Sequence, residues 1–491
     1  MATMHVVPPH LSQWLDGWGV PLRRRVDNAM AAGLARQHLA AIAVPLQVVR
    51  VGTDCSGAEA PIWSMRSMQL SHRHIFSSDV SKASQVMIAA NHSPAVFFKD
   101  LLARRDDEVP VVDLYVAGFP CTPFSMLHNN SKLLKEKAAK VFFKILQYLR
   151  RPDGPPAVVL ENVTGILRIK DRVLRLMRAA GYVVVLQQMD PTHLGEPVAR
   201  PRVYFLMVKA AFAIGSEKAL ETVVQSVWSS LKAPMIPLTS RCLHLNHPEV
   251  QRTLRLRQAK FRKAQLLNFR GHKEKPVWPA RHHAFVAAGS ARKHKGGLTV
   301  ARSPVSKCSA DALLLCNPRE RSAWSILSSS TSAGSLTVDL SQSVDRASVR
   351  TDGAVPTITP GSILASAQLG RTVIPIEKLM LHAFPIHRMV FPKDVTDADL
   401  ESLGGNTMHV MCVGVAIAMV LRMVDWAKVR RSGGRTGPDL LQPVAASRPG
   451  SKTAARAAAT SSGRIQQASK RGLFAQGKQT IQLKAKKSRH D

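Results

Sequence analysis

Four side chains in the first half of the chain could together form a nucleophilic active site. Cys121 follows the apolar run 111–118, and a thiol near a helix start has a lowered pKa, which favours the reactive thiolate. Glu161 closes the next apolar run, where its carboxyl could protonate a substrate as the thiolate attacks. Arg200 and Arg202 flank a single proline. They therefore share a face on which two guanidinium groups could bind a carbonyl or a phosphate.

Taken singly, none of these residues indicates a function. A cysteine on a loop is usually a small buried apolar residue, and a carboxyl at the end of a strand can cap a helix or pair with an arginine. Finding a thiol, an acid and two cations in this order makes nucleophilic catalysis the stronger interpretation.

The elements expected to position these residues form an α/β domain. Short apolar, β-branched runs predict strands, and apolar residues spaced by three and four predict helices between them. This alternation indicates a parallel sheet covered on both faces, and such sheets bind ligands beyond the carboxyl ends of their strands. The predicted strands are 46–53, 73–79, 111–118, 157–162, 182–188 and 202–208, and the predicted helices are 82–91, 135–150 and 172–180.

The charge of the chain points to a polyanionic partner. The 491 residues include 68 Lys and Arg against 33 Asp and Glu, a net charge of +35, and nucleic acid is the usual partner of so basic a protein. Residues 231–330 carry a net +15 with aromatic residues interleaved, and residues 427–491 carry a net +13 without apolar periodicity. We expect the first segment to contact nucleic acid and the second to be a disordered basic tail.

Composition excludes several other classes of protein. Six cysteines are too few for a disulfide scaffold, so we expect a reducing compartment. The N-terminus lacks the pattern of a secretory signal, and apolar runs such as 410–420 are shorter than the roughly 20 residues that span a bilayer. A zinc site built from Cys242, His244, His247, Cys308 and Cys316 is disfavoured because no CxxC pair is present, and we predict no metal.

The order of these motifs resembles that of the C5-cytosine-specific DNA methyltransferase family. Three segments are specific to it in combination: GFPCTPFS (118–125) for the nucleophile, ENV (161–163) for the acid and GEPVARPRVYFLMV (195–208) for the paired arginines. PTITPGS (356–362) and RTVIPIEKLMLHAFPI (371–386) are similar to segments that the family places after its target-recognition domain, and GGNTMHVMCVGVAIAMVL (404–421) resembles its closing motif.

The resemblance implies a fold, a reaction and a role for each motif residue. The implied fold is a Rossmann-like, S-adenosylmethionine-dependent methyltransferase domain with an inserted target-recognition domain. Cys121 would add to carbon 6 of a cytosine flipped out of double-stranded DNA, so that carbon 5 can accept the methyl group. Glu161 would donate a proton or hydrogen bond to ring nitrogen 3. Arg202 would hold the base carbonyl, and Arg200 would fix the neighbouring loop.

The same resemblance implies a set of cofactor contacts. Asp79 would bind the ribose hydroxyls and Asp100 the adenine amino group of S-adenosylmethionine. Both could instead be turn or helix caps. The remaining implied cofactor residues are Cys55, Ser56, Gly57, Pro120, Asn406 and Thr407.

Departures from the family pattern leave two other functions open. Cys55 and Glu59 stand where the family has a Phe and a Gly, which puts the shape of the cofactor loop in question. Thr122 and Val198 each replace a Gln. A catalytically inactive nucleic-acid-binding homologue is therefore one alternative. A tRNA cytosine-5 methyltransferase is the other, although the Cys-Phe-Thr signature of that branch is absent.

The motifs also predict a domain plan and a cellular setting. We expect an N-terminal helical extension (1–46), a first catalytic part (47–210), a target-recognition domain (211–355), a return segment that completes the catalytic domain (356–426) and the basic tail (427–491). We expect a monomer without membrane association. We further expect it in the nucleus, or in the cytoplasm if the source is bacterial.

Overall fold

The structure is a computed structural model that describes residues 5–39, 48–120, 139–268, 277–287, 317–328 and 333–432. Cys121 and Thr122, the candidate zinc ligands Cys308 and Cys316, and the tail from residue 433 lie outside the described residues.

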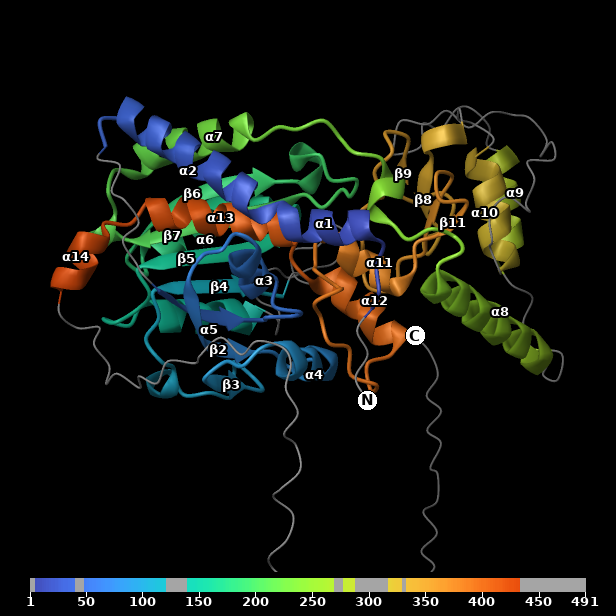
Figure 1. Ribbon diagram of the computed structural model, residues 1–491, viewed down its shortest axis with the longest axis horizontal. Coiled ribbons are helices and arrows are strands. Elements are labelled where there is room, and N and C mark those ends of the chain that lie inside the picture. The colour runs from blue at the N-terminus through green and yellow to red at the C-terminus, as the bar shows by residue number, and fades with distance from the viewer. Residues whose placement is uncertain are drawn as a thin grey trace, which may run out of the picture. The chain divides into compact units, whose positions relative to one another are not determined.

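A seven-stranded sheet forms the centre of residues 47–210 (Figure 1), in the order β3-β2-β1-β4-β5-β7-β6. The order reverses on either side of β1 and β4, as in doubly wound folds that bind ligands at this switch point. The prediction of a Rossmann-like α/β fold is therefore confirmed. The strands are β1 (Val49–Asp54), β2 (His72–Ser78), β3 (Val96–Phe98), β4 (Leu114–Gly118), β5 (Ala157–Val163), β6 (Tyr182–Met189) and β7 (Arg202–Lys209).

The sheet departs from the parallel arrangement at β7, which runs antiparallel to both β5 and β6. An antiparallel partner needs no crossover helix, so the chain returns from β6 through a short loop. The pairing sets Val163 opposite Arg202 and Glu161 opposite Tyr204. The start of β7 therefore meets the end of β5 at the same edge of the sheet.

Helices cover both faces of the sheet because its inner strands are apolar on both sides. Successive residues of β4 point to opposite faces of the sheet. Tyr115 and Val116, for example, belong to two separate apolar cores. One face packs against α2 (Gly19–Arg36), α3 (Ala60–Ser67), α7 (Glu217–Ser230) and α13 (Val410–Arg422), and the other against α5 (Ala139–Leu149) and α6 (Lys170–Arg178).

The predicted return segment completes the first core. It contains α11 (Pro375–Met380), α12 (Asp397–Asn406) and α13. Twelve of the 13 residues of α13 are buried, and the helix packs against α2, α3, β5 and β7. The segment Asp397–Arg422 is long and apolar enough to cross a membrane, but 94% of its most apolar window is buried inside the fold. Its apolar character is thus accounted for by core packing.

A second, four-stranded antiparallel sheet has the order β11-β10-β8-β9. It extends from residue 337 to 372 and so crosses the domain boundary expected at 355. The strands are β8 (Thr337–Asp339), β9 (Val349–Arg350), β10 (Leu364–Ser366) and β11 (Arg371–Thr372), and the helices α8 (Pro248–Asn268), α9 (Trp278–Ala287) and α10 (Pro318–Ser328) precede them in the chain. Trp324 and Leu327 of α10 pack in the core of this sheet.

The chain ends of the described region are helical. The N-terminal extension forms α1 (Pro9–Gly17) and α2, whose Val26, Met30 and Leu34 are buried in the first core. Helix α4 (Lys82–Asn91) matches its predicted range. Beyond the boundary expected at 426, α14 (Trp426–Arg431) buries Trp426 and Val429, so ordered structure continues into the segment expected to be a tail.

Candidate active site

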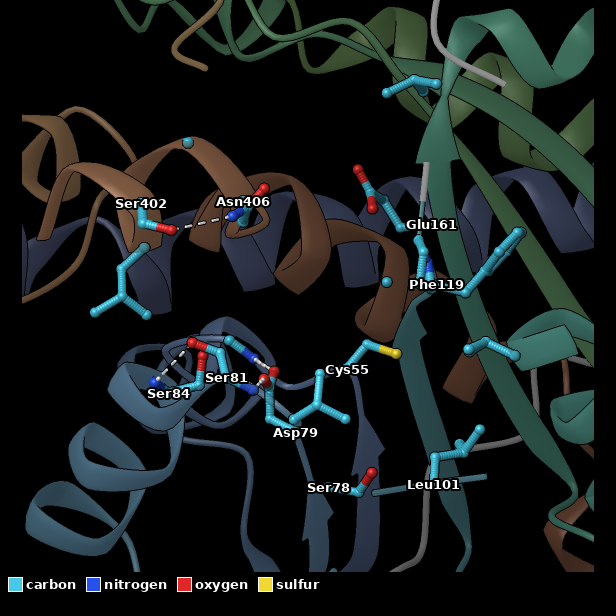
Figure 2. Close-up of a pocket in the computed structure, with 18 of the residues that line it drawn as sticks. Cys55, Ser78, Asp79, Ser81, Ser84, Leu101, Phe119, Glu161, Ser402 and Asn406 are labelled. Atoms are coloured by element: carbon cyan, nitrogen blue, oxygen red, sulfur yellow. Dashed lines mark hydrogen bonds between the residues drawn. The ribbon is translucent and has the colours of Figure 1, made fainter. Parts of the chain in front are cut away.

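A cavity of about 340 Å³ lies at the carboxyl ends of β1, β2, β4 and β5, closed on one side by α12. The predicted site residues gather there from seven separate stretches of sequence. Figure 2 shows Asp79, Cys55 and Glu161 around this space, with Ser402 and Asn406 of α12 across from Asp79. The predicted residues that line it are Cys55, Gly57, Asp79, Asp100, Pro120, Glu161, Arg200, Arg202 and Asn406.

Glu161 forms the acidic wall of the cavity. Its carboxyl is buried at the end of β5 and lies 3.1 Å from Nε of Arg202 on β7. Burial raises the pKa of Glu161, and the cations Arg202 and Arg200 only partly oppose that shift. Gly118 permits this placement, because a Cβ there would lie 3.3 Å from a Glu161 carboxyl oxygen and 2.9 Å from Met408. The group is thus suited to donate a proton at a higher pH than an ordinary glutamate.

Arg200 has a different environment from Arg202. Its buried guanidinium donates to the carbonyl oxygens of Ile358 (3.0 Å), Gly405 (3.1 Å) and Thr407 (2.5 Å). These contacts join the start of β7 to the segment after the second sheet and to the C-terminal end of α12. The contact set suits the loop-fixing role expected of Arg200, while Arg202 is the cation that faces the acid.

The described chain stops one residue before the predicted nucleophile. Pro120 and Phe119 line the cavity, and Asn162 Nδ2 donates to the Phe119 carbonyl over 3.1 Å, which ties the end of β4 to the end of β5. Cys55 also lines the cavity, but burial and the neighbouring carboxylates raise the pKa of its thiol well above the ordinary value. Cys55 is therefore held as a thiol, which is a poor nucleophile.

The opposite end of the cavity is acidic and rich in backbone N–H groups. The Asp79 carboxylate accepts the N–H of Gly57 (2.8 Å) and of Ser81 (2.8 Å). Asp100 accepts the N–H of Leu102 over 2.8 Å, so it does cap a turn while also lining the cavity. Burial raises the pKa of Asp79, and the two N–H donors act against this shift.

The loop after β1 keeps its location without the family's second glycine. Cys55, Gly57 and Glu59 have φ angles of 51°, 56° and 60°. A non-glycine residue in this left-handed region costs roughly 1–2 kcal/mol, so Cys55 and Glu59 are strained. The loop therefore forms without the second glycine, and the strained backbone of Cys55 and Glu59 is the cost.

Two predicted cofactor residues do not line the cavity. Ser56 is buried, with its hydroxyl 2.9 Å from that of Thr53 and 3.2 Å from the Ser78 carbonyl. Thr407 is buried beneath the loop, and a Cβ on Gly57 would lie 3.9 Å from its hydroxyl oxygen. In the described region that hydroxyl has no hydrogen-bond partner. Both residues pack behind the residues that line the cavity.

Several lining residues were not predicted from the sequence. Ser81, which also caps α4, could have been found from its position directly after a strand end. Ser402 and Leu403 could not, because only the docking of α12 brings them to the cavity. The unpredicted lining residues are Ser78, Val80, Ser81, Ser84, Leu101, Val141, Val163, Ser402, Leu403 and Gly405.

Two other positions noted in the sequence lie in an apolar core. Val198 forms a bridge with Val355 and is fully buried beside Ile358 and Leu364, so its side chain packs where a hydrogen-bonding Gln was expected. Cys242 belongs to the same core. Within the described ranges, no three His, Cys, Asp or Glu side chains form a group able to hold a metal ion.

Sequence comparison identifies the class of this region. Residues 55–255 match the C-5 cytosine-specific DNA methylase family. The match covers less than half of the chain, and it confirms the resemblance drawn from its motifs.

The named relatives are DNA (cytosine-5-)-methyltransferases. The enzyme DMT5 of Cryptococcus neoformans is 26% identical over 231 residues, which cover 42% of this chain and 9% of that protein. DMT5 of Verticillium dahliae is 24% identical over 499 residues, which cover 81% of this chain and 20% of that protein. The chain thus spans one fifth or less of the length of these two relatives. Among solved structures, the Dnmt2 methyltransferase of S. pombe has a TM-score of 0.43 at 15% identity, covering 76% of this chain and 98% of that one.

Proposed function

We propose that the protein is a DNA (cytosine-5-)-methyltransferase that acts through a covalent Cys121 adduct. One observation carries the proposal. The buried acid Glu161, its partner Arg202 and Pro120, the residue before Cys121, line the same cavity as Asp79 and Asp100. At one end of the cavity, an acid with a raised pKa lies beside a cation, which suits the binding of a base. At the other end, two carboxylates suit the binding of a nucleoside cofactor next to that base.

The residues present fit S-adenosylmethionine. A cavity of about 340 Å³ lies within the usual range for small-molecule sites, roughly 300–1,000 Å³. Asp79 and Asp100 offer carboxylate acceptors for hydroxyl and amino groups, and Leu101 and Phe119 offer apolar surface. The unpartnered Thr407 hydroxyl lies close to Gly57, where Asn406 is also at the cavity. When bound, the cofactor supplies an electrophilic methyl group.

The chain's own residues divide the remaining chemistry. The Cys121 thiolate forms a bond to carbon 6 of cytosine, which makes carbon 5 nucleophilic. Glu161, whose raised pKa keeps a proton available, donates to ring nitrogen 3 as charge develops there. Arg202 holds the base carbonyl oxygen, and Arg200 fixes the loop that borders the cavity. After methylation, loss of the carbon 5 proton and release of the thiolate restore the aromatic ring.

Duplex DNA is the proposed substrate, and its target base must be flipped to reach a cavity at the sheet edge. The net +15 of residues 231–330 provides attraction to the phosphate backbone. The family and the DMT5 relatives favour DNA over tRNA, which remains the alternative substrate. We propose a nuclear location, since these relatives are fungal. A bacterial source would instead place the protein in the cytoplasm.

The proposal is tested by incubating the protein with labelled S-adenosylmethionine and either duplex DNA or tRNA, in parallel reactions. We expect label on carbon 5 of cytosine in DNA, and none with Cys121→Ala. Label on tRNA alone would move the activity to RNA. Binding of DNA without label, at several sequences and salt concentrations, would identify an inactive homologue.

A further inference from the structure

The buried carboxyl of Glu59 occupies a position that no part of the proposed chemistry uses. Glu59 precedes α3 and has no exposed surface. Its side chain does not cap the helix that follows it. It turns instead into the sheet, where Oε1 accepts hydrogen bonds from Thr53 Oγ1 (2.8 Å) on β1 and Ser77 Oγ (2.5 Å) on β2.

These bonds continue to the cofactor loop. Thr53 Oγ1 lies 2.9 Å from Ser56 Oγ, and the Ser56 N–H donates to the Ser78 carbonyl over 3.1 Å. The backbone N–H of Glu59 closes the turn by donating to the Ser56 carbonyl over 2.8 Å. Ser56 is therefore held against the sheet from both its side chain and its backbone.

Because Ser56 is held against the sheet, the positions of its neighbours Cys55 and Gly57 at the cavity are also set. Cys55 and Gly57, on either side of Ser56, both line the cavity. The N–H of Gly57 reaches the Asp79 carboxylate over 2.8 Å. The orientation of Asp79, the proposed ribose contact, is thus linked to the loop that Glu59 anchors.

Both the backbone conformation and the burial of Glu59 are unfavourable, and local packing alone does not explain why a glutamate stands here. Its φ of 60° and ψ of 45° lie in the left-handed region, which glycine adopts without strain. Desolvation is also unfavourable to a buried carboxyl. A glycine would remove both costs, so the residue at this position is explained by what its carboxyl binds.

We propose that Glu59 is a positioning residue for the cofactor, which sets the Cys55–Gly57 loop through its hydrogen bonds to Thr53 and Ser77. This rests on the proposed function only in naming S-adenosylmethionine as the ligand. The anchoring of the loop is a property of the ligand-free protein. Both parts can therefore be tested separately.

The decisive variant is Glu59→Gly in the full chain. It relieves the left-handed strain but removes the acceptor. We expect its Kd for S-adenosylmethionine, measured by calorimetry, to rise about tenfold or more, the size of effect expected from losing hydrogen bonds to a carboxylate. Turnover at saturating cofactor should change far less. Hydrogen exchange of residues 54–59 in the ligand-free variant should accelerate.

Two further variants separate positioning from packing. Glu59→Gln keeps an oxygen acceptor for both hydroxyl donors, so it should restore affinity and exchange protection to near the wild-type values. Gln69→Gly is the matched control, since exposed Gln69, two residues after the end of α3, has a φ of 52°. It relieves the same kind of strain and should leave cofactor affinity unchanged.

The outcomes distinguish the possibilities. Wild-type affinity and exchange in Glu59→Gly would show that the carboxyl positions nothing. If that variant does not fold, Ser77→Ala, which removes one donor to Glu59, takes its place and should show the same changes to a smaller extent. If the wild-type protein itself binds no S-adenosylmethionine, the proposed function fails, and the exchange experiment alone decides the role of Glu59.

Discussion

Arg202 Nε lies 3.1 Å from Glu161 Oε1, across the antiparallel pair of strands β5 and β7. The carboxyl is buried, so the cation and the desolvation of the acid act on its pKa in opposite directions, and desolvation dominates. Arg202 therefore limits how far the pKa of Glu161 rises.

Replacing Arg202 with alanine should alter both the rate and its pH dependence. Because we propose that Glu161 acts in its protonated form, methyl transfer should fall as pH rises through its pKa. Without the cation that pKa rises further, so the alkaline decline should move to higher pH, with a rate loss of about 10²–10³-fold from the missing contact to the base. Single-turnover rates across pH measure both effects. A decline at the wild-type pH in Arg202→Ala would contradict the assignment. Glu161→Gln, which cannot titrate, should show no such decline.

Arg200→Ala should destabilise the fold as well as the site. Its guanidinium supplies hydrogen bonds to the carbonyls of Ile358, Gly405 and Thr407. Leaving buried carbonyls unpaired costs about 1–3 kcal/mol each when no water replaces the donor. We expect a loss of about 3 kcal/mol in the free energy of unfolding, measured in urea. Arg200→Lys should recover part of it. Equal stability of Arg200→Ala and the wild type would mean that these contacts contribute little.

A buried ion pair beneath the cofactor loop provides a second stability test. Arg104 donates two hydrogen bonds of 2.5 Å to Asp54, which also accepts from Tyr115 over 2.6 Å. Arg104→Ala leaves the Asp54 charge buried and unpaired, which typically costs about 3–5 kcal/mol. The double variant Arg104→Met with Asp54→Asn removes both charges and should be more stable than Arg104→Ala. Calorimetric unfolding of the set checks this. The expectation fails if the double variant is the least stable of the three.

The stability of the protein should depend on Glu59 in a specific pH range. Burial raises the pKa of Glu59 from 4.5 to about 7 in the folded state. The folded protein thus holds this proton more tightly than the unfolded chain. Stability from this group is complete below pH 4.5 and is lost as pH rises through about 7, a change of about 3 kcal/mol. Glu59→Gln lacks the titration, so the wild type should lose stability relative to it over that range. Parallel curves for the two proteins would contradict the shift.

The sequence predicted the strands and their terminal residues best. The run 157–162 has four apolar residues followed by Glu161 and Asn162, which places Glu161 near a strand end by local pattern alone. The short strand β3 and the helix α7 were not among the predicted elements. The antiparallel pairing of β7 with β5 was also not predicted, because periodicity reports which residues are buried and not which strands become neighbours.

The partners of buried charges could not be predicted for a different reason. Arg200 binds carbonyls 158 to 207 residues further along the chain. Glu59 looked like an unfavourable substitution in a glycine-rich loop, because its partners on β1 and β2 become neighbours only when the sheet forms. Spacing in a sequence carries no information on such pairs.

The burial of α13 has a consequence for how the chain is made. The sheet ends with β7 at residue 209, yet the helix that covers β5 and β7 ends at residue 422. At roughly 5–20 residues per second, a ribosome needs on the order of 10–40 s to make the intervening stretch. During that interval α2, α3 and α7 have already been made, but the apolar surface of β5 and β7 that α13 contacts stays exposed. We expect the nascent chain to be most prone to aggregation until this last core helix has emerged.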